Sequence, residues 1–150
     1  MDAPDDRTAA ITTLRVAGLR VTSTRLAVLD ALQDCQHATA EALEHHVRGS
    51  VGTVSKQAVY NVLAAFTQAG LVRQIEPAGS PVRYETRTGD NHHHLVCRSC
   101  GTVADLDCQV DEAPCLTPTD DLGFEIDEAE IVFWGYCPSC QTTRKTKETS

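Results

Sequence analysis

The sequence predicts an α+β protein of two domains, the first helical with a small β-hairpin and the second a smaller α/β domain. Three observations predict this fold. Apolar residues recur at helical spacing through the first 70 positions and then in short strand-like runs. Residues 1–88 carry nine Lys/Arg and nine Asp/Glu, whereas residues 89–150 carry four and twelve and hold the whole net charge of −8. Four of the seven cysteines form two Cys-x-x-Cys pairs in the second half.

Four helices are predicted within residues 1–70, each from apolar residues at helical spacing and a residue suited to cap its start. The first helix contains Ile11 and Leu14 and ends near Gly18. The others begin at the candidate caps Ser23, Thr39 and Ser55, and their inward residues are Leu26, Leu29 and Leu32; Leu43, His46 and Val47; and Val59, Val62, Leu63 and Phe66. Gly70 is expected to end the fourth helix.

Two short strands are predicted next, LVRQIE at 71–76 and PVRYE at 81–85, joined by the turn PAGS. Helices followed by a small hairpin are typical of a winged helix-turn-helix, in which the fourth helix reads DNA. A plain helical domain with a hairpin is the alternative. Either way, these elements make up a first domain over residues 1–85.

The polar face at the start of the fourth helix favours the DNA-reading interpretation. Gln57 and Asn61 can hydrogen-bond adenine, and the ring of Tyr60 can pack on thymine methyl groups. Arg20 and Arg25 lie at the start of the second helix, where contacts with the DNA backbone or minor groove are expected. Double-stranded DNA is therefore the predicted partner of the first domain.

A polar segment with a glycine, residues 86–91, is predicted to be a hinge before the second domain at 92–140. In that domain HLVC and TVADL predict strands on either side of the turn RSCG, CQVDEAPCLTPTDDLG predicts loops, and FEIDEAEIVFWGY predicts mainly strand. The polar tail, residues 141–150, is expected to be disordered.

The two Cys-x-x-Cys pairs predict a structural metal site. Cys97 and Cys100 are separated by 36 residues from Cys137 and Cys140, and each pair lies at a strand end or turn. Four thiolates form a closed tetrahedral site of the structural Zn²⁺ type, which leaves no position open for catalysis. Two redox-active dithiols and an iron–sulfur site are the alternatives.

The remaining cysteines and the start of the chain indicate the cellular compartment of the protein. An odd number of cysteines argues against a complete disulfide framework, and Cys35 is expected to be buried and inert, while Cys108 and Cys115 are expected to be reactive thiols or spare ligands. The acidic start lacks the pattern of a signal peptide, and no apolar run approaches the roughly 20 residues of a membrane span. A cytoplasmic protein without a membrane partner is predicted.

The histidines at 92–94 predict a second site. Side chains alternate along a strand, so His92 and His94 share one face and His93 points to the other. Glu85 and Asp105 are candidate carboxylate ligands, and imidazole mixed with carboxylate suits iron or manganese. His37 is a candidate from farther along the chain, which no spacing argument alone reaches.

Together these motifs resemble the ferric uptake regulator family of metal-dependent repressors. The resemblance rests on GLRVTSTRLAVLDAL, VSKQAVYNVLAAFTQAGLV, RYE, HHHLVCRSCGTVADL and CPSC, which span most of residues 14–140 in the family's order. The segments DNHHHLVCRSCG and DEAEIVFWGYCPSC are most similar to the actinobacterial branch tied to catalase-peroxidase control.

The resemblance implies a role for each matching position. It implies structural zinc at the four paired cysteines and a regulatory Fe²⁺ or Mn²⁺ site, with Zn²⁺ or Ni²⁺ as alternatives, that bridges the two domains through His37, Glu85, His92, His94 and Asp105. It implies DNA contacts by Arg20, Gln57 and Tyr60. It further implies a homodimer formed through the second domain, which binds a palindromic operator when loaded with metal.

Some positions depart from the family pattern. Asn61 stands where the family often has arginine, which places one DNA contact in doubt. A third metal site found in some members is not predicted, because only His93 and Glu112 match it. Family peroxide sensors tend to have Asp at the position of Asp105, which this chain matches. They also often have Asp at the position of Glu85, which this chain does not match. We therefore expect a peroxide-sensing repressor of catalase-type genes, with an iron-, zinc- or nickel-responsive repressor of metal-uptake genes as the alternative.

Enzyme classes fit the motifs less well. A zinc deaminase would need His-x-Glu followed by Pro-Cys-x-x-Cys, and neither is present. A Cys-x-x-Cys oxidoreductase would need a βαβ context. A zinc-ribbon interaction module explains the cysteines but leaves the fourth helix without a role. No enzymatic activity is predicted.

Overall fold

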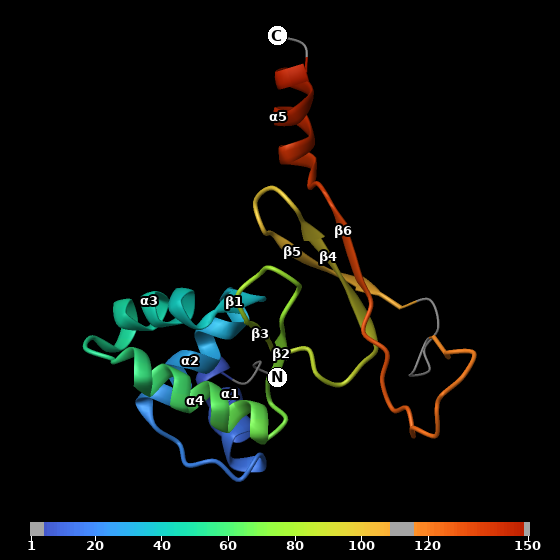
Figure 1. The fold of residues 1–150 in the computed structure, drawn as a ribbon. Helices are drawn as coiled ribbons and strands as arrows, with labels where there is room; N and C mark the ends of the chain where they lie inside the picture. The colour runs from blue at the N-terminus through green and yellow to red at the C-terminus, as the bar shows by residue number, and fades with distance from the viewer. Residues whose placement is uncertain (1–4, 109–115, 149–150) are drawn as a thin grey trace. The chain divides into compact units, whose positions relative to one another are not determined.

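The computed structural model describes residues 5–108 and 116–148. It divides the chain into two compact units, Met1–Thr88 and Gly89–Ser150 (Figure 1). The predicted domain limits at 85 and 92 stay a prediction. Within the described part of the chain, no helix has the length and apolar character that crossing a membrane requires.

Four helices form the body of unit 1: α1 (Asp6–Val16), α2 (Ser23–Asp34), α3 (Ala40–Val51) and α4 (Lys56–Gln68). They enclose one apolar cluster, and α4 contributes to it the four residues predicted to face inward: Val59, Val62, Leu63 and Phe66. Leu29 and Leu32 of α2 are buried, and Leu26 packs against the cluster at its edge. The inward face predicted for α3 is confirmed for Leu43 and Val47, but not for His46, which is exposed.

The caps of these helices explain where they begin. Thr39 and Ser55 cap α3 and α4 as predicted, because their hydroxyls accept hydrogen bonds from the N–H groups of Ala42 and Ala58. The prediction for α2 is wrong by one residue. Thr22, in extended conformation, accepts the bond from the N–H of Arg25 at 3.2 Å, and Ser23 is already helical.

Two helices, α1 and α4, end at a glycine with positive φ. After α4, Gly70 has φ of 74°, its N–H bonds to the carbonyl of Thr67, and the N–H of Leu71 bonds to the carbonyl of Phe66. This pair of bonds is the Schellman arrangement, which a residue with a Cβ adopts less readily. Gly18 ends α1 in the same way, so both predicted stops are confirmed.

A three-stranded antiparallel sheet completes unit 1, with the order β1-β3-β2. The predicted hairpin is present as β2 (Arg73–Ile75) and β3 (Arg83–Glu85). The short strand β1 (Ala38–Thr39), which the sequence did not predict, pairs with Tyr84 and Arg83 of β3. Through β1, the loop after α2 is joined to the hairpin.

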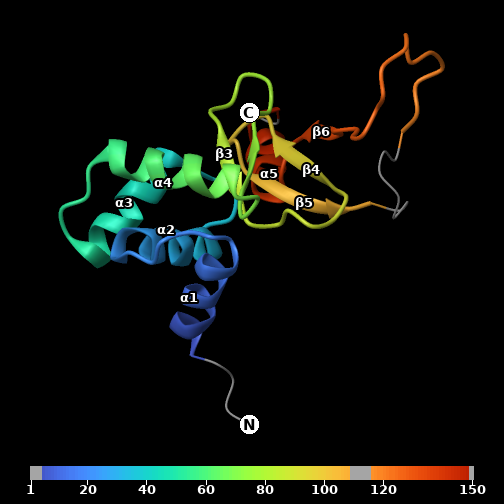
Figure 2. The same ribbon diagram turned by 90° about the horizontal axis from the view of Figure 1, so that it is seen from below.

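Unit 2 contains a sheet of the order β5-β4-β6, with β4 (His92–Cys97) in the middle (Figure 2). β5 (Val103–Asp107) pairs antiparallel to β4, and β6 (Val132–Gly135) pairs parallel to it. The prediction of mainly strand for 124–136 is wrong, because only the last part forms β6 and residues 124–131 carry no regular element.

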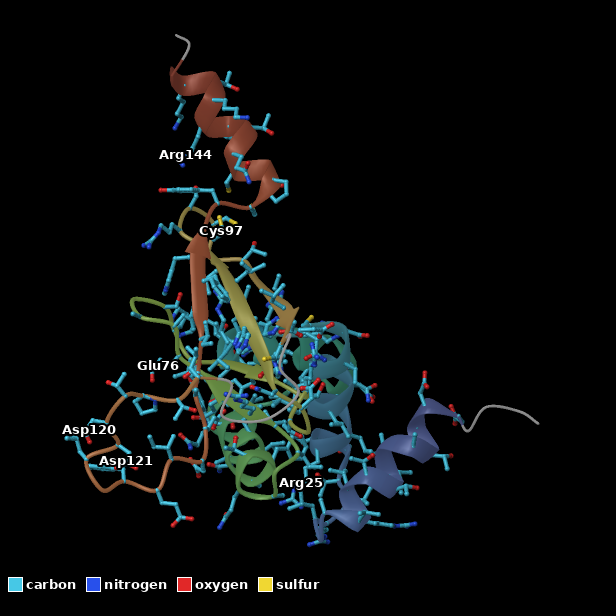
Figure 3. The ribbon with its side chains drawn as sticks, turned by 90° about the vertical axis from the view of Figure 1, so that its right-hand side faces the viewer. Arg25, Glu76, Cys97, Asp120, Asp121 and Arg144 are labelled. Atoms are coloured by element: carbon cyan, nitrogen blue, oxygen red, sulfur yellow. The ribbon has the colours of Figure 1, made fainter. Side chains whose placement is uncertain are left out.

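Residues 141–148 of the polar tail belong to a helix, α5 (Pro138–Glu148), which corrects the expectation of disorder for that part of the tail. It starts with proline, which suits the first helical position because no N–H is needed there. Its last turn carries Lys145 and Lys147, favourably placed for the helix dipole. The guanidinium of Arg144 stacks 3.8 Å over the ring of Tyr136 and ties the helix to the segment after β6 (Figure 3).

Candidate metal centres and DNA-facing surface

The parallel pairing of β4 with β6 brings the two Cys-x-x-Cys pairs together. Cys97 is the last residue of β4 and lies opposite Gly135 at the end of β6. Two residues after Gly135 the chain reaches Cys137, and the first turn of α5 carries Cys140. Figure 3 shows sulfur atoms gathered at Cys97, between the end of the strands and α5.

The four thiols fit a single tetrahedral ion. The Sγ atoms of Cys97, Cys100, Cys137 and Cys140 all lie within 4.8 Å of one another. The Cys100 and Cys137 sulfurs are 3.7 Å apart, and a tetrahedral Zn²⁺ with Zn–S bonds of about 2.3 Å requires about 3.8 Å. The N–H of Cys137 points at Cys97 Sγ at 3.4 Å, as backbone donors do beside thiolate ligands.

The electrostatics of the four thiols also suit a cation. Hydrogen bonds from the backbone of Cys100 and then of Cys137 lower the pKa of Cys97 to about 6. The pKa of Cys140 is affected most by a hydrogen bond with Ser99, which lowers it, but Cys137, burial and the other thiols together raise it to about 12. Four thiolates therefore do not coexist at this spacing until a positive ion compensates them.

In unit 2, two histidines converge on one carboxylate oxygen. The Nε2 atoms of His92 and His94 each lie 3.6 Å from Oδ1 of Asp105 on the paired strand β5. The Nδ1 atom of His92 lies 2.9 Å from Oδ1 of Asp90, a contact that orients the ring. Both imidazoles are buried, and their rings meet edge to face at 4.8 Å.

His93 lies on the other face of β4, as the alternation of the strand predicts. Its ring meets that of Phe133 on β6, with the centroids 6.4 Å apart. The sequence left His93 without a role, and the structure places it in an aromatic contact. Glu112 and Cys115 lie outside the described residues, and Cys108 accepts a hydrogen bond from the side chain of Asn91 at 3.6 Å.

In unit 1, His37 and Glu85 meet although 48 positions separate them. His37 Nε2 lies 3.1 Å from Glu85 Oε2, and both side chains are buried. His37 has φ of 60°, a left-handed conformation that is uncommon outside glycine. The pairing of β1 with β3 supports this conformation, because it carries His37 beside the end of β3.

Three further residues hold His37 in place, and the sequence analysis missed them. Arg83 Nη1 donates to the carbonyl of His37 at 3.1 Å. Gln36 and Thr86 bond twice, since the Gln36 amide donates to the Thr86 hydroxyl at 2.8 Å and accepts from its N–H at 3.3 Å. The strand β1 positions these residues. Because it has only two residues, it leaves no periodic pattern in the sequence from which they could be predicted.

The residues expected to contact DNA lie at the surface of unit 1. Gln57, Tyr60 and Asn61 are exposed on α4, and the Gln57 amide donates to the Asn61 side chain at 2.9 Å. Arg20 is exposed just before α2, and its carbonyl accepts a bond of 2.7 Å from the Arg25 guanidinium (Figure 3). These two hydrogen bonds orient the side chains of Gln57 and Arg25 at the surface.

Comparisons with known proteins agree with this arrangement. The sequence profile of the Ferric uptake regulator family matches residues 16–133. Transcriptional regulator FurA of Mycobacterium tuberculosis is 59% identical over 127 residues, covering 85% of this chain and 86% of that protein. The peroxide operon regulator of Bacillus subtilis is 30% identical over 137 residues, covering 87% and 90%. The crystal structure of the Vibrio cholerae ferric uptake regulator is similar with a TM-score of 0.64 at 28% identity, covering 84% and 98%.

The match to the family profile spans most of the chain, and it includes α2, α4, the histidine strand and β5. The family predicted from the motifs is thereby confirmed, and with it the α+β fold and the regulatory rather than enzymatic class. The chain belongs to the Ferric uptake regulator family of metal-dependent transcriptional regulators.

Proposed function

We propose that this chain is a repressor that binds operator DNA when a divalent metal ion is held by His37, Glu85, His92, His94 and Asp105. The observation that carries the proposal is the convergence of His92 and His94 on Asp105, each at 3.6 Å. Two imidazoles and a carboxylate form a ligand set that suits Fe²⁺ and Mn²⁺ and also accepts Zn²⁺ or Ni²⁺.

His37 and Glu85 supply the ligands of the first unit to the same ion. They already lie 3.1 Å apart on a backbone held by β1, so the pair needs little reorganisation to bind. When one ion is shared by ligands of both units, the hinge between them loses freedom. The ion then acts by selecting the arrangement that fits DNA, and a preference of a few kcal/mol is enough to set operator occupancy.

Unit 1 is proposed to read DNA as a winged helix-turn-helix. α3 and α4 supply the helix pair, the β2–β3 hairpin supplies the wing, and the exposed side chains at the start of α4 face the major groove. Gln57 and Tyr60 contact base edges, and Arg20 reaches the minor groove or the phosphates. A two-fold dimer of such units fits a palindromic operator.

The second unit is proposed to form the homodimer. Regulators of this family are DNA-binding dimers, and one face of the sheet in unit 2 exposes Leu95, Leu106 and Phe133, at 43%, 40% and 45%. His93 and Leu95 are two positions apart on β4, so they share a face of the sheet. Leu106 on β5 lies opposite His93 and Phe133 on β6 lies opposite Leu95, so both lie on that face. A second copy removes this apolar surface from water.

The signal is proposed to be peroxide. An aspartate stands at position 105, where family peroxide sensors tend to have one, and a peroxide operon regulator is among the relatives. Fe²⁺ bound there would activate peroxide. One peroxide oxygen would enter the ring of His37 or His92 and the other would leave as water, so the ring supplies the two electrons that peroxide accepts. The oxidised ring would bind the metal less tightly, and the DNA would be released. The controlled genes are proposed to be of the catalase type.

Glu85 favours a second candidate, a repressor of metal-uptake genes that responds to iron, zinc or nickel. Family peroxide sensors often have aspartate where Glu85 stands. In this alternative the metal acts by occupancy alone, and peroxide leaves the rings intact.

The deciding experiment measures operator binding by the purified zinc-loaded protein after addition of Fe²⁺, Mn²⁺, Zn²⁺ or Ni²⁺, with and without peroxide. We expect peroxide to abolish binding only in the iron form, together with a mass increase of one oxygen on the peptide of His37 or His92. Insensitivity of the iron form to peroxide would overturn peroxide sensing and favour the metal-uptake alternative.

Two variants separate the regulatory ion from the rest of the protein. His92→Ala removes one proposed ligand and is expected to lower metal-dependent DNA binding at least tenfold. His45→Ala, an exposed histidine of α3 outside the proposed site, is the matched control. Equal operator binding by both variants would contradict the assignment of the site.

A further inference from the structure

Two side chains that the sequence placed in the core lie together at the surface of unit 1. Cys35, at the C-terminal cap of α2, is half-buried, and His46 is exposed on α3. Cys35 Sγ lies 3.8 Å from His46 Nδ1. Neither residue belongs to the metal centres or to the DNA-facing surface.

Asp34 completes the cluster from the other side of the imidazole. Its Oδ2 lies 3.6 Å from His46 Nε2. A carboxylate beside one ring nitrogen favours the tautomer with its proton there, which leaves the lone pair on the other nitrogen. In that tautomer, His46 presents the lone pair of Nδ1 toward the Cys35 sulfur. The same carboxylate–imidazole arrangement orients histidines that bind metals.

The local charge favours a cation at this position. Cys35 and Asp34 lie at the C-terminal end of α2, where the helix dipole is negative. The last turn of α2 contains no basic residue to compensate it. The Cys35 sulfur and the Asp34 carboxylate lie beside an uncompensated helix end, and the side chain of His46, which is 43% exposed, leaves this electronegative position open to solvent.

The distance between the two donor atoms matches a shared ion. A tetrahedral ion with bonds of about 2.3 Å to sulfur and about 2.0 Å to nitrogen separates them by about 3.5 Å, and a linear ion separates them by about 4.3 Å. The observed 3.8 Å lies between these limits. Thiolate and imidazole together select Zn²⁺ or Cu⁺ over hard cations.

We propose that Cys35 and His46 form a binding site for a thiophilic cation, Zn²⁺ or Cu⁺, with Asp34 orienting the imidazole. Water completes the coordination, because only two protein atoms reach the ion. The site links the end of α2 to α3 within unit 1. It is independent of the proposed regulatory ion, since it shares no ligand with it.

The test measures how fast Cys35 is alkylated by iodoacetamide, with peptide mass spectrometry to resolve each cysteine. The full chain, with its four-cysteine site loaded, is compared without added metal, with Zn²⁺, and with Cu⁺ kept reduced by ascorbate. We expect at least tenfold slower alkylation of Cys35 with one of the two cations. The cation that protects at the lower free concentration is the ligand.

Three variants locate the protection. His46→Phe is expected to lose it, since the ring remains but the nitrogen donor is gone. His45→Ala, one position away on α3, is expected to keep it. His92→Ala is also expected to keep it, because the protection does not pass through the regulatory ion. Unchanged alkylation of Cys35 with both cations, or equal protection in His46→Phe, overturns the proposal.

Discussion

The two units of the chain are stabilised by different means. The apolar cluster built from all four N-terminal helices lies wholly in unit 1. In unit 2, Val96 and Cys97 are the only buried apolar side chains among the described residues, and the neighbouring buried positions on β4 are histidines. Unit 1 is therefore a hydrophobically stabilised domain, whereas unit 2 has few buried apolar side chains and is expected to depend on the ion proposed at its four cysteines and on the proposed dimer surface.

This difference suits a regulator that responds to metal. A unit with its own core keeps its shape whether or not the ion is present, so the DNA-reading surface is preformed. A unit without a large core responds strongly when an ion or a partner is removed. Changes that affect one unit and spare the other test this difference.

Loss of the four-cysteine site is expected to have the largest effect. Structural zinc contributes about 10 kcal/mol or more to folding in small metal-dependent domains. Cys137→Ser, or chelation under reducing conditions, should therefore unfold the sheet of unit 2 and abolish dimer formation and operator binding. Amide NMR spectra should retain the dispersed signals of unit 1 and lose those of β4, β5 and β6.

Cys35→Ser is the matched control, because it removes a thiol from unit 1 that lies outside the four-cysteine site. Its spectrum should remain that of the wild type, and it should retain the zinc of the four-cysteine site. Retention of the unit 2 signals in Cys137→Ser would show that the sheet folds without its ion and would remove the contrast between the units.

Truncation of the core of unit 1 is expected to have the next largest effect. Phe66 is fully buried, and Phe→Ala changes in cores cost about 3–5 kcal/mol. Phe66→Ala should lower the thermal unfolding temperature of unit 1 and leave zinc content unchanged. Calorimetry with zinc analysis measures both.

Phe133→Ala is the matched control for Phe66→Ala, since the same side chain is 45% exposed on β6. It should leave the unfolding of unit 1 unchanged and weaken the dimer, as measured by sedimentation. A destabilisation of unit 1 by both variants would mean that the units do not unfold separately.

The same difference explains what the sequence predicted well. Helices of unit 1 leave a 3.6-residue pattern because their apolar residues face one core, and the inward face of α4 was predicted completely. The two Cys-x-x-Cys pairs predict that four cysteines lie together, and their sulfur atoms are within 4.8 Å of one another. In both cases the spacing of residues along the sequence reflects the interaction that is expected to stabilise the structure.

Other features left no such pattern. α5 has no apolar face, so its polar sequence predicts disorder rather than a helix. Residues 124–131 are the reverse case: apolar and polar side chains alternate there, apart from the adjacent Asp127 and Glu128, yet no strand forms. Cys35 and His46 meet across two helices, and His37 meets Glu85 through a strand of two residues, so their pairing depends on tertiary structure.

A smaller effect tests the start of α2. Thr22 caps this helix and Ser23 does not, although the two residues are neighbours. Loss of a capping hydroxyl costs about 1 kcal/mol. Thr22→Ala should therefore destabilise unit 1 by about that amount in denaturant titrations, and Ser23→Ala should change little. The reverse order would restore Ser23 as the cap.

The smallest effect concerns two tyrosines of unit 1. Burial raises the pKa of Tyr84 above its ordinary value of 10.0, and the negative charge of ionised Tyr60 raises it further. Because the pKa is higher in the folded state, neutral Tyr84 stabilises unit 1 fully below pH 10, and this contribution is lost as the pH rises through the folded-state pKa. Absorbance at 295 nm follows the ionisation, and Tyr84→Phe identifies its share.

Tyr60→Phe then separates the two causes. It removes the smaller one, so the pKa of Tyr84 should fall but remain above 10, because burial is unchanged. A pKa of Tyr84 that is the same in Tyr60→Phe and wild type would mean that the two hydroxyls do not interact. A measured coupling would show that the charge of Tyr60, on the exposed face of α4, affects the ionisation of Tyr84 on β3 of the proposed wing. Both residues belong to unit 1, so this interaction should not depend on the ions proposed for unit 2.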